Sequence, residues 1–168
     1  MNWEAIGAVG EVLGAMAVVV TLIFLIQQLR QTSLQLRLNS SQTASNTYSG
    51  RIREVLTNPE LTRVFRNGLD HYSDLSPDDQ ARFHGIMMGF QVSYAQNVQL
   101  WQEGVISDEN FRGWEDDWIK ILKCPGSQQW WLWVRAMLGA EAAAAVEDLL
   151  ARSNQPPLNE IVPFLRAI

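Results

Sequence analysis

A long apolar segment near the N-terminus sets the first limit on the structures that this sequence can form. Residues 6–26 contain one charged residue, Glu11, and the stretch that ends at Ile26 reads VLGAMAVVVTLIFLI. Because a helix rises 1.5 Å per residue, about 20 apolar residues cross a bilayer core. We therefore expect one transmembrane helix here. The alternatives are a buried core helix and a secretory signal, which would need a basic start and a small-residue cleavage site.

The charges that flank this segment predict its orientation. All 13 Lys and Arg lie at or after Arg30, and Arg30 and Arg37 follow the apolar run closely. Positive residues near a span favour the cytoplasmic side, so we expect the N-terminus outside and the rest of the chain in the cytoplasm. The net charge of −5 argues against a nucleic-acid partner, which would require a basic face.

The apolar segment carries a stripe of small residues. The spacing of 3, 4, 3 and 4 places all five on one helix face: Gly7, Gly10, Gly14, Ala17 and Thr21. Small residues let helices in lipid approach closely, so the stripe predicts a homo-oligomer or a partner membrane helix. The competing interpretation is that Gly and Ala are simply common in membrane helices.

Glu11 lies inside the expected span, at the margin of this small-residue stripe. A carboxylate in a membrane usually reaches water, a partner or an ion path. Three interpretations stay open: contact with headgroup water, a hydrogen bond across an oligomer interface, or a proton or ion site.

After the anchor, the sequence predicts only helices. Apolar residues recur at spacings of three and four, and no strand alternation stands out. We expect an all-α fold in which the transmembrane helix continues into a stem, followed by a small helical bundle. The predicted parts are an anchor (1–29), a stem (30–57), a cytoplasmic helical domain (58–152) and a loosely held tail (153–168).

Start and stop signals divide the domain into short helices. Asn58-Pro59 and Ser76-Pro77 each read as a cap followed by a first-turn proline, and Ser107 or Asp108 caps a fourth helix. We expect Cys124-Pro125-Gly126 to end that helix and Ser127 to restart the chain. The last predicted helix runs from about Ala140 to Arg152.

Six of the seven tryptophans fall between Trp101 and Trp133. They predict either a tryptophan-rich core or an aromatic face against a membrane surface or a partner. Trp130, Trp131 and Trp133 cannot all face one direction on a helix, so at least one should lie near the surface.

No group of residues suggests catalysis or metal binding. His71 and His84 lack partners at metal-ligand spacing, and the acidic turn around Asp78 and Asp79 lacks the order of a calcium loop. Residues 115–117 read as the solvated face of the fourth helix. We interpret Cys124, the single cysteine, as a packed small residue, and we expect no cofactor, no metal and no enzymatic activity.

Several segments carry a resemblance to a known group. The opening Asn2–Glu11, the exit Gln27–Thr32, the segment Trp101–Ile106 and the segment Pro125–Trp131 are similar to an uncharacterised family of small bacterial single-pass membrane proteins with a helical C-terminal domain. The resemblance implies a place in the bacterial inner (plasma) membrane, and it transfers no catalytic residues.

These patterns lead to two functional hypotheses. The first is a non-enzymatic, self-associating membrane module whose helical domain meets a protein partner. The second is a small ion or proton conductor formed by oligomerised anchor helices, with Glu11 near the pore.

Overall fold

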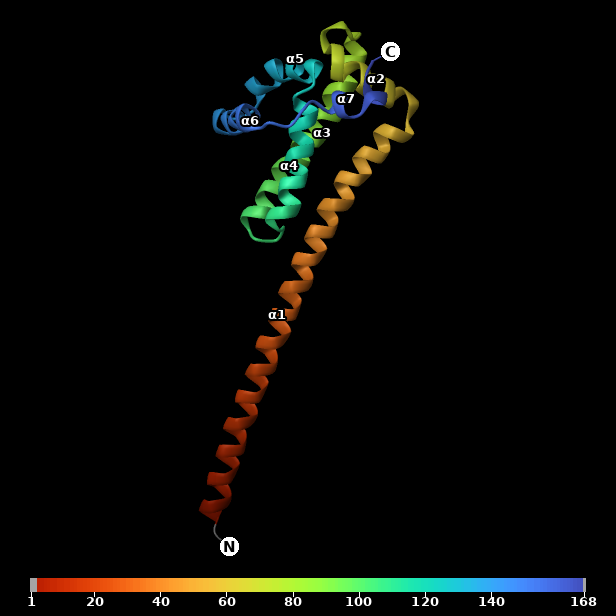
Figure 1. Ribbon diagram of the computed structural model, residues 1–168. Helices are drawn as coiled ribbons and strands as arrows, with labels where there is room; N and C mark the ends of the chain where they lie inside the picture. Colours follow the sequence, from red (N-terminus) through yellow and green to blue (C-terminus); the bar gives the residue numbers. More distant parts are fainter. Residues whose placement is uncertain (1–2, 168) are drawn as a thin grey trace. The chain divides into compact units, whose positions relative to one another are not determined.

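The computed structural model describes the backbone of residues 3–167 and the side chains of residues 7–11 and 13–167. Met1 and Asn2, where the predicted anchor begins, lie outside the described residues. Throughout the described chain the fold is all-α, as predicted, with seven α-helices, three 3-10 helices and no strand (Figure 1). The chain divides into two compact units, residues 1–40 and 41–168.

The first unit consists of the N-terminal part of helix α1 (Trp3–Thr57). This helix is the one described helix that is long and apolar enough to cross a membrane, and no part of its apolar window is buried. Its large apolar side chains between Val9 and Leu38 are 46–67% exposed. The predicted continuation of the apolar segment into the stem is confirmed, because α1 has no break before Thr57.

The second unit combines the end of α1 with the remaining helices. These are α2 (Pro59–His71), η1 (Tyr72–Asp74), α3 (Pro77–Gln102), α4 (Asp108–Leu122), α5 (Pro125–Val134), η2 (Arg135–Met137), α6 (Ala140–Arg152), α7 (Leu158–Ile161) and η3 (Pro163–Leu165). Helix α2 packs against α3 and α5, and α4 packs against α3 and α5.

Local hydrogen bonds set most of the helix starts. The Asn58 side chain accepts from the backbone N–H of Glu60 at 3.0 Å, and the Ser76 hydroxyl accepts from Asp79 N–H at 3.2 Å. Ser107 caps α4 by accepting from Asn110 N–H at 3.3 Å. These side chains satisfy N–H groups that the first helical turn leaves free, as the sequence predicts.

One predicted boundary is wrong. Helix α4 ends at Leu122, but the chain does not restart at Ser127, because Pro125 already begins α5 with Cys124 in the capping position. A proline in the first turn lacks only an N–H that would have no partner in the helix, so it starts this helix instead of interrupting the chain.

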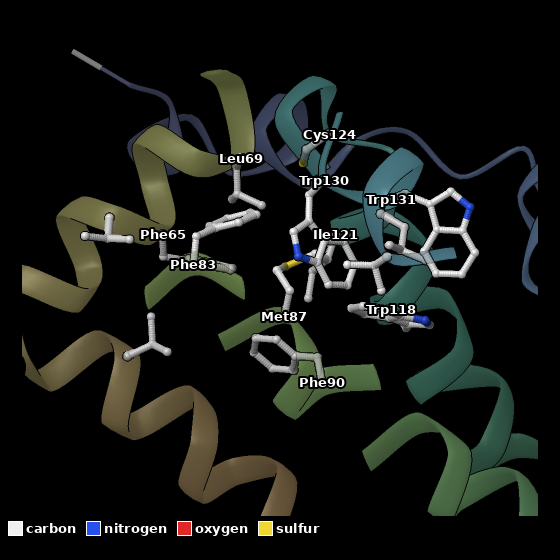
Figure 2. Close-up of a cluster of buried hydrophobic side chains, with 14 of the residues drawn as sticks. Phe65, Leu69, Phe83, Met87, Phe90, Trp118, Ile121, Cys124, Trp130 and Trp131 are labelled. Atoms are coloured by element: carbon white, nitrogen blue, oxygen red, sulfur yellow. The ribbon is translucent and has the colours of Figure 1, made fainter. Parts of the chain in front are cut away.

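A single hydrophobic core holds the second unit together. It unites Val55 from α1 with side chains from α2 to α6 and from the tail. Figure 2 shows the contributions of α2 to α5. Trp130, Phe83 and Leu69 are fully buried at its centre. The C-terminal end of α1 therefore covers the core with its apolar face.

Two glycines allow helices to pack closely against α2. A Cβ on Gly126 would overlap the carbonyl oxygen of Gly68 and lie 2.9 Å from the backbone nitrogen of Tyr72. A Cβ on Gly68 would overlap the Phe83 ring of α3. Gly126 therefore permits the approach of α5 to the backbone of α2, and Gly68 makes room for α3.

The expectation of a loose tail is wrong for residues 158–167. Leu165 is 7% exposed and joins the core. The carboxylate of Asp70 accepts hydrogen bonds from the Asn159 side chain and from Ala167 N–H, the latter at 2.6 Å. The Arg66 guanidinium donates to the Arg166 carbonyl at 2.8 Å. Helix α2 therefore holds the tail at several points.

Candidate functional site

The predicted helix-association residues all lie on α1 within the first unit. A Cβ at Gly7, Gly10 or Gly14 would meet nothing within 4 Å. The Thr21 hydroxyl donates to the carbonyl of Ala17 at 2.8 Å, so it is satisfied within its own helix. The stripe thus offers an open, small-residue surface to another helix.

The side chain of Glu11 is exposed on the same helix. No described residue forms a hydrogen bond or ion pair with it. Contact with headgroup water, with a second chain or with an ion path all stay open for this carboxylate.

The three tryptophans predicted as a contact surface separate into two kinds. Trp130 is fully buried and donates its indole N–H to His84 Nδ1 at 3.2 Å, and Trp131 is 3% exposed. Both belong to the core and offer no surface to a partner. Trp133 is 73% exposed, as expected for at least one of the three. Only Trp133 can therefore serve as the predicted surface contact.

The second unit contains an apolar pocket of about 220 Å³. It lies where the end of α1 meets α2, α3, α4 and the tail. Leu56 and Phe164, which are 54% and 72% exposed, lie at its edge. Its lining comprises Tyr48, Ile52, Val55, Leu56, Phe65, Phe90, Asp117, Ile121, Leu158, Phe164 and Leu165. We refer to this set as the apolar pocket.

Tyr48 and Asp117 are the two titratable residues of the apolar pocket. Burial, followed by the charge of Asp117 and its hydrogen bonding, raises the pKa of Tyr48 above its ordinary value. Asp117 also meets the Lys120 ammonium at 3.5 Å, and its side chain is 51% exposed. This pocket can accept an apolar group that carries a hydrogen-bond donor, because its walls are apolar and its polar side holds a carboxylate.

A second tyrosine contacts another carboxylate of α4. The Tyr94 hydroxyl of α3 donates to Glu115 at 3.3 Å. Burial of the phenol and the charge of Glu115 raise the pKa of Tyr94. Residues 115–117 are half-exposed or exposed, as predicted for a solvated face, but Glu115 and Asp117 also interact with tyrosines from α3 and α1.

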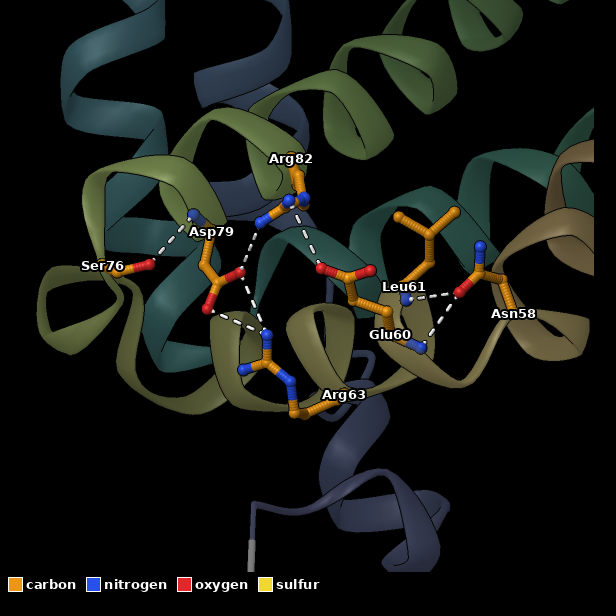
Figure 3. Close-up of polar contacts among 7 residues, drawn as sticks. All are labelled: Asn58, Glu60, Leu61, Arg63, Ser76, Asp79 and Arg82. Atoms are coloured by element: carbon orange, nitrogen blue, oxygen red, sulfur yellow. Dashed lines mark hydrogen bonds and ion pairs between the residues drawn. The ribbon is translucent and has the colours of Figure 1, made fainter.

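The acidic first turn of α3 contributes to the packing of the second unit. Asp79 is 8% exposed, and both its oxygens lie 3.0 Å from Arg63 Nη2 (Figure 3). Arg82 reaches the same carboxylate at 3.1 Å and Glu60 at 3.3 Å. Burial raises the pKa of Asp79, but the hydrogen bonds and charge of Arg63, with the bonds from Arg82 and Ser76, lower the pKa overall. This network joins α2 to α3.

The remaining chemically active side chains are occupied by packing. Cys124 is fully buried, and burial raises the pKa of its thiol, although hydrogen bonds from Asn159 and Leu158 act in the opposite direction. His84 Nδ1 accepts a hydrogen bond from the indole N–H of Trp130. Among the described residues, no three His, Cys, Asp or Glu side chains come together in a way that could hold a metal ion.

The comparisons with known proteins add no identity. No protein-family model, curated protein or solved structure matches this chain. Function must therefore be argued from the exposed apolar segment of α1 and from the apolar pocket.

The sequence could not reveal this pocket. Tyr48 belongs to a series of residues with ordinary helical spacing. Asp117 belongs to an acidic run that resembles any solvent-exposed helix face. Only the folded chain brings the two residues together.

Proposed function

We propose that this chain is a single-pass, membrane-anchored helical module that associates with itself and binds a protein partner through its second unit. The exposed apolar surface of α1 carries this proposal. Between Val9 and Leu38 the large apolar side chains are 46–67% exposed. Leaving such a surface in water would cost on the order of tens of kcal/mol, which supports a bilayer as its environment.

The small-residue stripe supports self-association. In a bilayer, apolar burial gives two helices no reason to pair, and close backbone contact has to supply the attraction. Gly10 and Gly14 present open backbone on one face. Copies in one membrane also meet at a high effective concentration, so a modest attraction is enough.

The features of the second unit support a binding function more than a catalytic one. It presents an apolar pocket with one carboxylate and an exposed Trp133. The flanking Arg30 and Arg37 favour a cytoplasmic position for this unit in a bacterial inner membrane. An engineered protease site between the units, cut only from the cytoplasmic side, would test the orientation.

Self-association is tested with the full chain in nanodiscs by crosslinking and native mass measurement. We expect Gly10→Ile combined with Gly14→Ile to weaken association at least about tenfold, because branched side chains keep the helices apart. The matched control, Met16→Ile with Val19→Ile, changes the opposite face and should leave association intact. A monomeric wild type, or glycine variants that behave as wild type, would contradict the proposal.

The second candidate function is a small ion or proton conductor built from oligomerised anchors. The observation in its favour is Glu11, the one charged residue in residues 6–26, because intramembrane carboxylates often line ion paths. Flux across liposomes containing the protein should then fall with Glu11→Gln. Flux that is absent, or equal in the two proteins, removes this candidate.

A further inference from the structure

The chain itself carries a side chain that suits its apolar pocket. We propose that the apolar pocket of one copy receives the Trp133 side chain of a second copy. This inference rests on the proposed self-association and names the contact that the second unit contributes to it.

Trp133 stands out among the tryptophans of the second unit. It is 73% exposed on α5, whereas Trp130 and Trp131 on the same helix are core residues. Leu132 and Met137 beside it are 62% and 70% exposed, so the indole belongs to an apolar projection. No residue of α5 lines the apolar pocket, which leaves the pocket of the same chain without this side chain.

The pocket matches an indole in size and chemistry. An engineered apolar cavity of roughly 150 Å³ binds benzene, so the pocket of about 220 Å³ has room for the larger indole. An indole also needs a partner for its N–H when it is buried. Asp117 offers a half-exposed carboxylate at the polar side of the pocket, where it meets Lys120 at 3.5 Å and interacts with the Tyr48 hydroxyl. A carboxylate accepts several hydrogen bonds, so it can also accept the indole N–H.

Charge favours the same pairing. Arg135, two residues after Trp133, is 51% exposed and carries a positive charge beside the apolar projection. Among the described residues, the one charged side chain that lines the pocket is the Asp117 carboxylate on α4, which is opposite in charge to Arg135. Arg135 meets Glu147 at 3.2 Å within its own chain, a contact between two half-exposed groups that a second acidic neighbour can share.

The contact is small, and the shared membrane compensates for its size. A buried tryptophan contributes about 150–250 Å², well below the roughly 800 Å² per partner of a stable soluble complex. Anchoring in one bilayer raises the effective concentration to about the millimolar range, where such a contact is populated. We place the contact head-to-tail: each copy presents both an indole and a pocket, so a chain of such contacts can extend beyond two copies.

The test uses two labelled forms of the full chain, mixed in liposomes. One form carries Ala136→Cys beside Trp133, and the other carries Phe164→Cys at the edge of the pocket. A short bis-maleimide should join the two forms, and the native Cys124 stays silent because it is fully buried. We expect crosslinking between position 136 of one copy and position 164 of the other.

The decisive control introduces Trp133→Ala into one labelled form at a time. Trp133→Ala in the Ala136→Cys form should slow crosslinking at least about 30-fold, the loss typical of a central interface tryptophan. In the Phe164→Cys form, Trp133→Ala should leave the crosslinking rate unchanged, because that copy supplies only the pocket to the crosslinked contact. Leu56→Trp, which covers the mouth of the pocket, should act only in the Phe164→Cys form. This asymmetry separates a lost contact from a lost fold.

Equal effects in both forms, or no effect in either, would overturn the inference. If the asymmetry is absent while the Gly10→Ile and Gly14→Ile pair still weakens association, the proposed function stands and only the pocket contact falls. If neither the glycine variants nor the variants at Trp133 and Leu56 affect association, both proposals fall.

Discussion

Replacing Gly126 with alanine should destabilise the second unit, although alanine is the better helix former. The new Cβ would overlap the carbonyl oxygen of Gly68 and lie 2.9 Å from Tyr72 N. Both obstacles are backbone atoms of a neighbouring helix, so no side-chain rotation can relieve them. Helix α2 or α5 would have to shift, and with it the core side chains that each helix buries.

The size of the effect follows from two opposing contributions. Overpacking of this kind costs about 1–3 kcal/mol. Alanine gains about 0.5–1 kcal/mol over glycine inside a helix, and less in the first turn, where Gly126 lies. We therefore expect a net loss of about 1–2 kcal/mol. Gly113→Ala is the matched control, because it lies within α4, is exposed and has open space around its Cβ. It should gain about 0.5–1 kcal/mol.

The two variants are compared by urea unfolding of the full chain in detergent micelles. Tryptophan fluorescence reports on the second unit, since six of the seven tryptophans lie between Trp101 and Trp133. The variants should differ by about 2 kcal/mol, with wild type between them. If Gly126→Ala proves as stable as Gly113→Ala, α2 and α5 do not pack backbone against backbone, and the reasoning is refuted.

Three further predictions concern the same unit. Asp79→Asn should lower the thermal midpoint at neutral pH and flatten its acid dependence. The pKa of Asp79 is lower in the folded protein than its unfolded value of 3.8, so its carboxylate stabilises the fold above that value. This stability is lost as pH falls through the folded pKa. Equal pH profiles of the thermal midpoint for wild type and Asp79→Asn would contradict this. Tyr48 and Tyr94 should resist ionisation above the ordinary tyrosine pKa of about 10. Their raised pKa values give stability that is present below pH 10 and is lost as pH rises through the folded values; tyrosinate absorbance checks this, and a normal titration of the folded protein would refute it. Leu165→Ala should lose about 2–4 kcal/mol in urea unfolding because it empties a core site, whereas the exposed Phe164→Ala should stay within about 0.5 kcal/mol; similar losses would contradict the packed tail.

The helices of the second unit could be predicted because their signals are local. Asn58 and Ser76 each bond to an N–H two or three residues ahead, so the sequence holds both partners of the cap side by side. The alanine-rich helix, whose predicted bounds of Ala140 and Arg152 are confirmed, has no side-chain cap, but its alanines favour a helix by their own propensity. The start of α5 was missed because Pro125 can either end one helix or begin the next.

The tail and the apolar pocket depend on residues far apart in the chain, and neither left a local signal. The tail lacks helical spacing, and Asp70, which holds it, gives no sign in the sequence of a partner at Asn159. Tyr48 and Asp117 likewise come from different helices. The close approach at Gly68 was also missed, since one glycine within a helix does not reveal which neighbour needs the space.

The docking of residues 158–167 on α2 has a consequence for how the protein is made. Leu165 completes the core and follows every other core residue along the chain, so the core cannot close before this residue is synthesised. Until then a nascent chain exposes an unfinished apolar surface. A chaperone that shields this surface would raise the yield of folded protein.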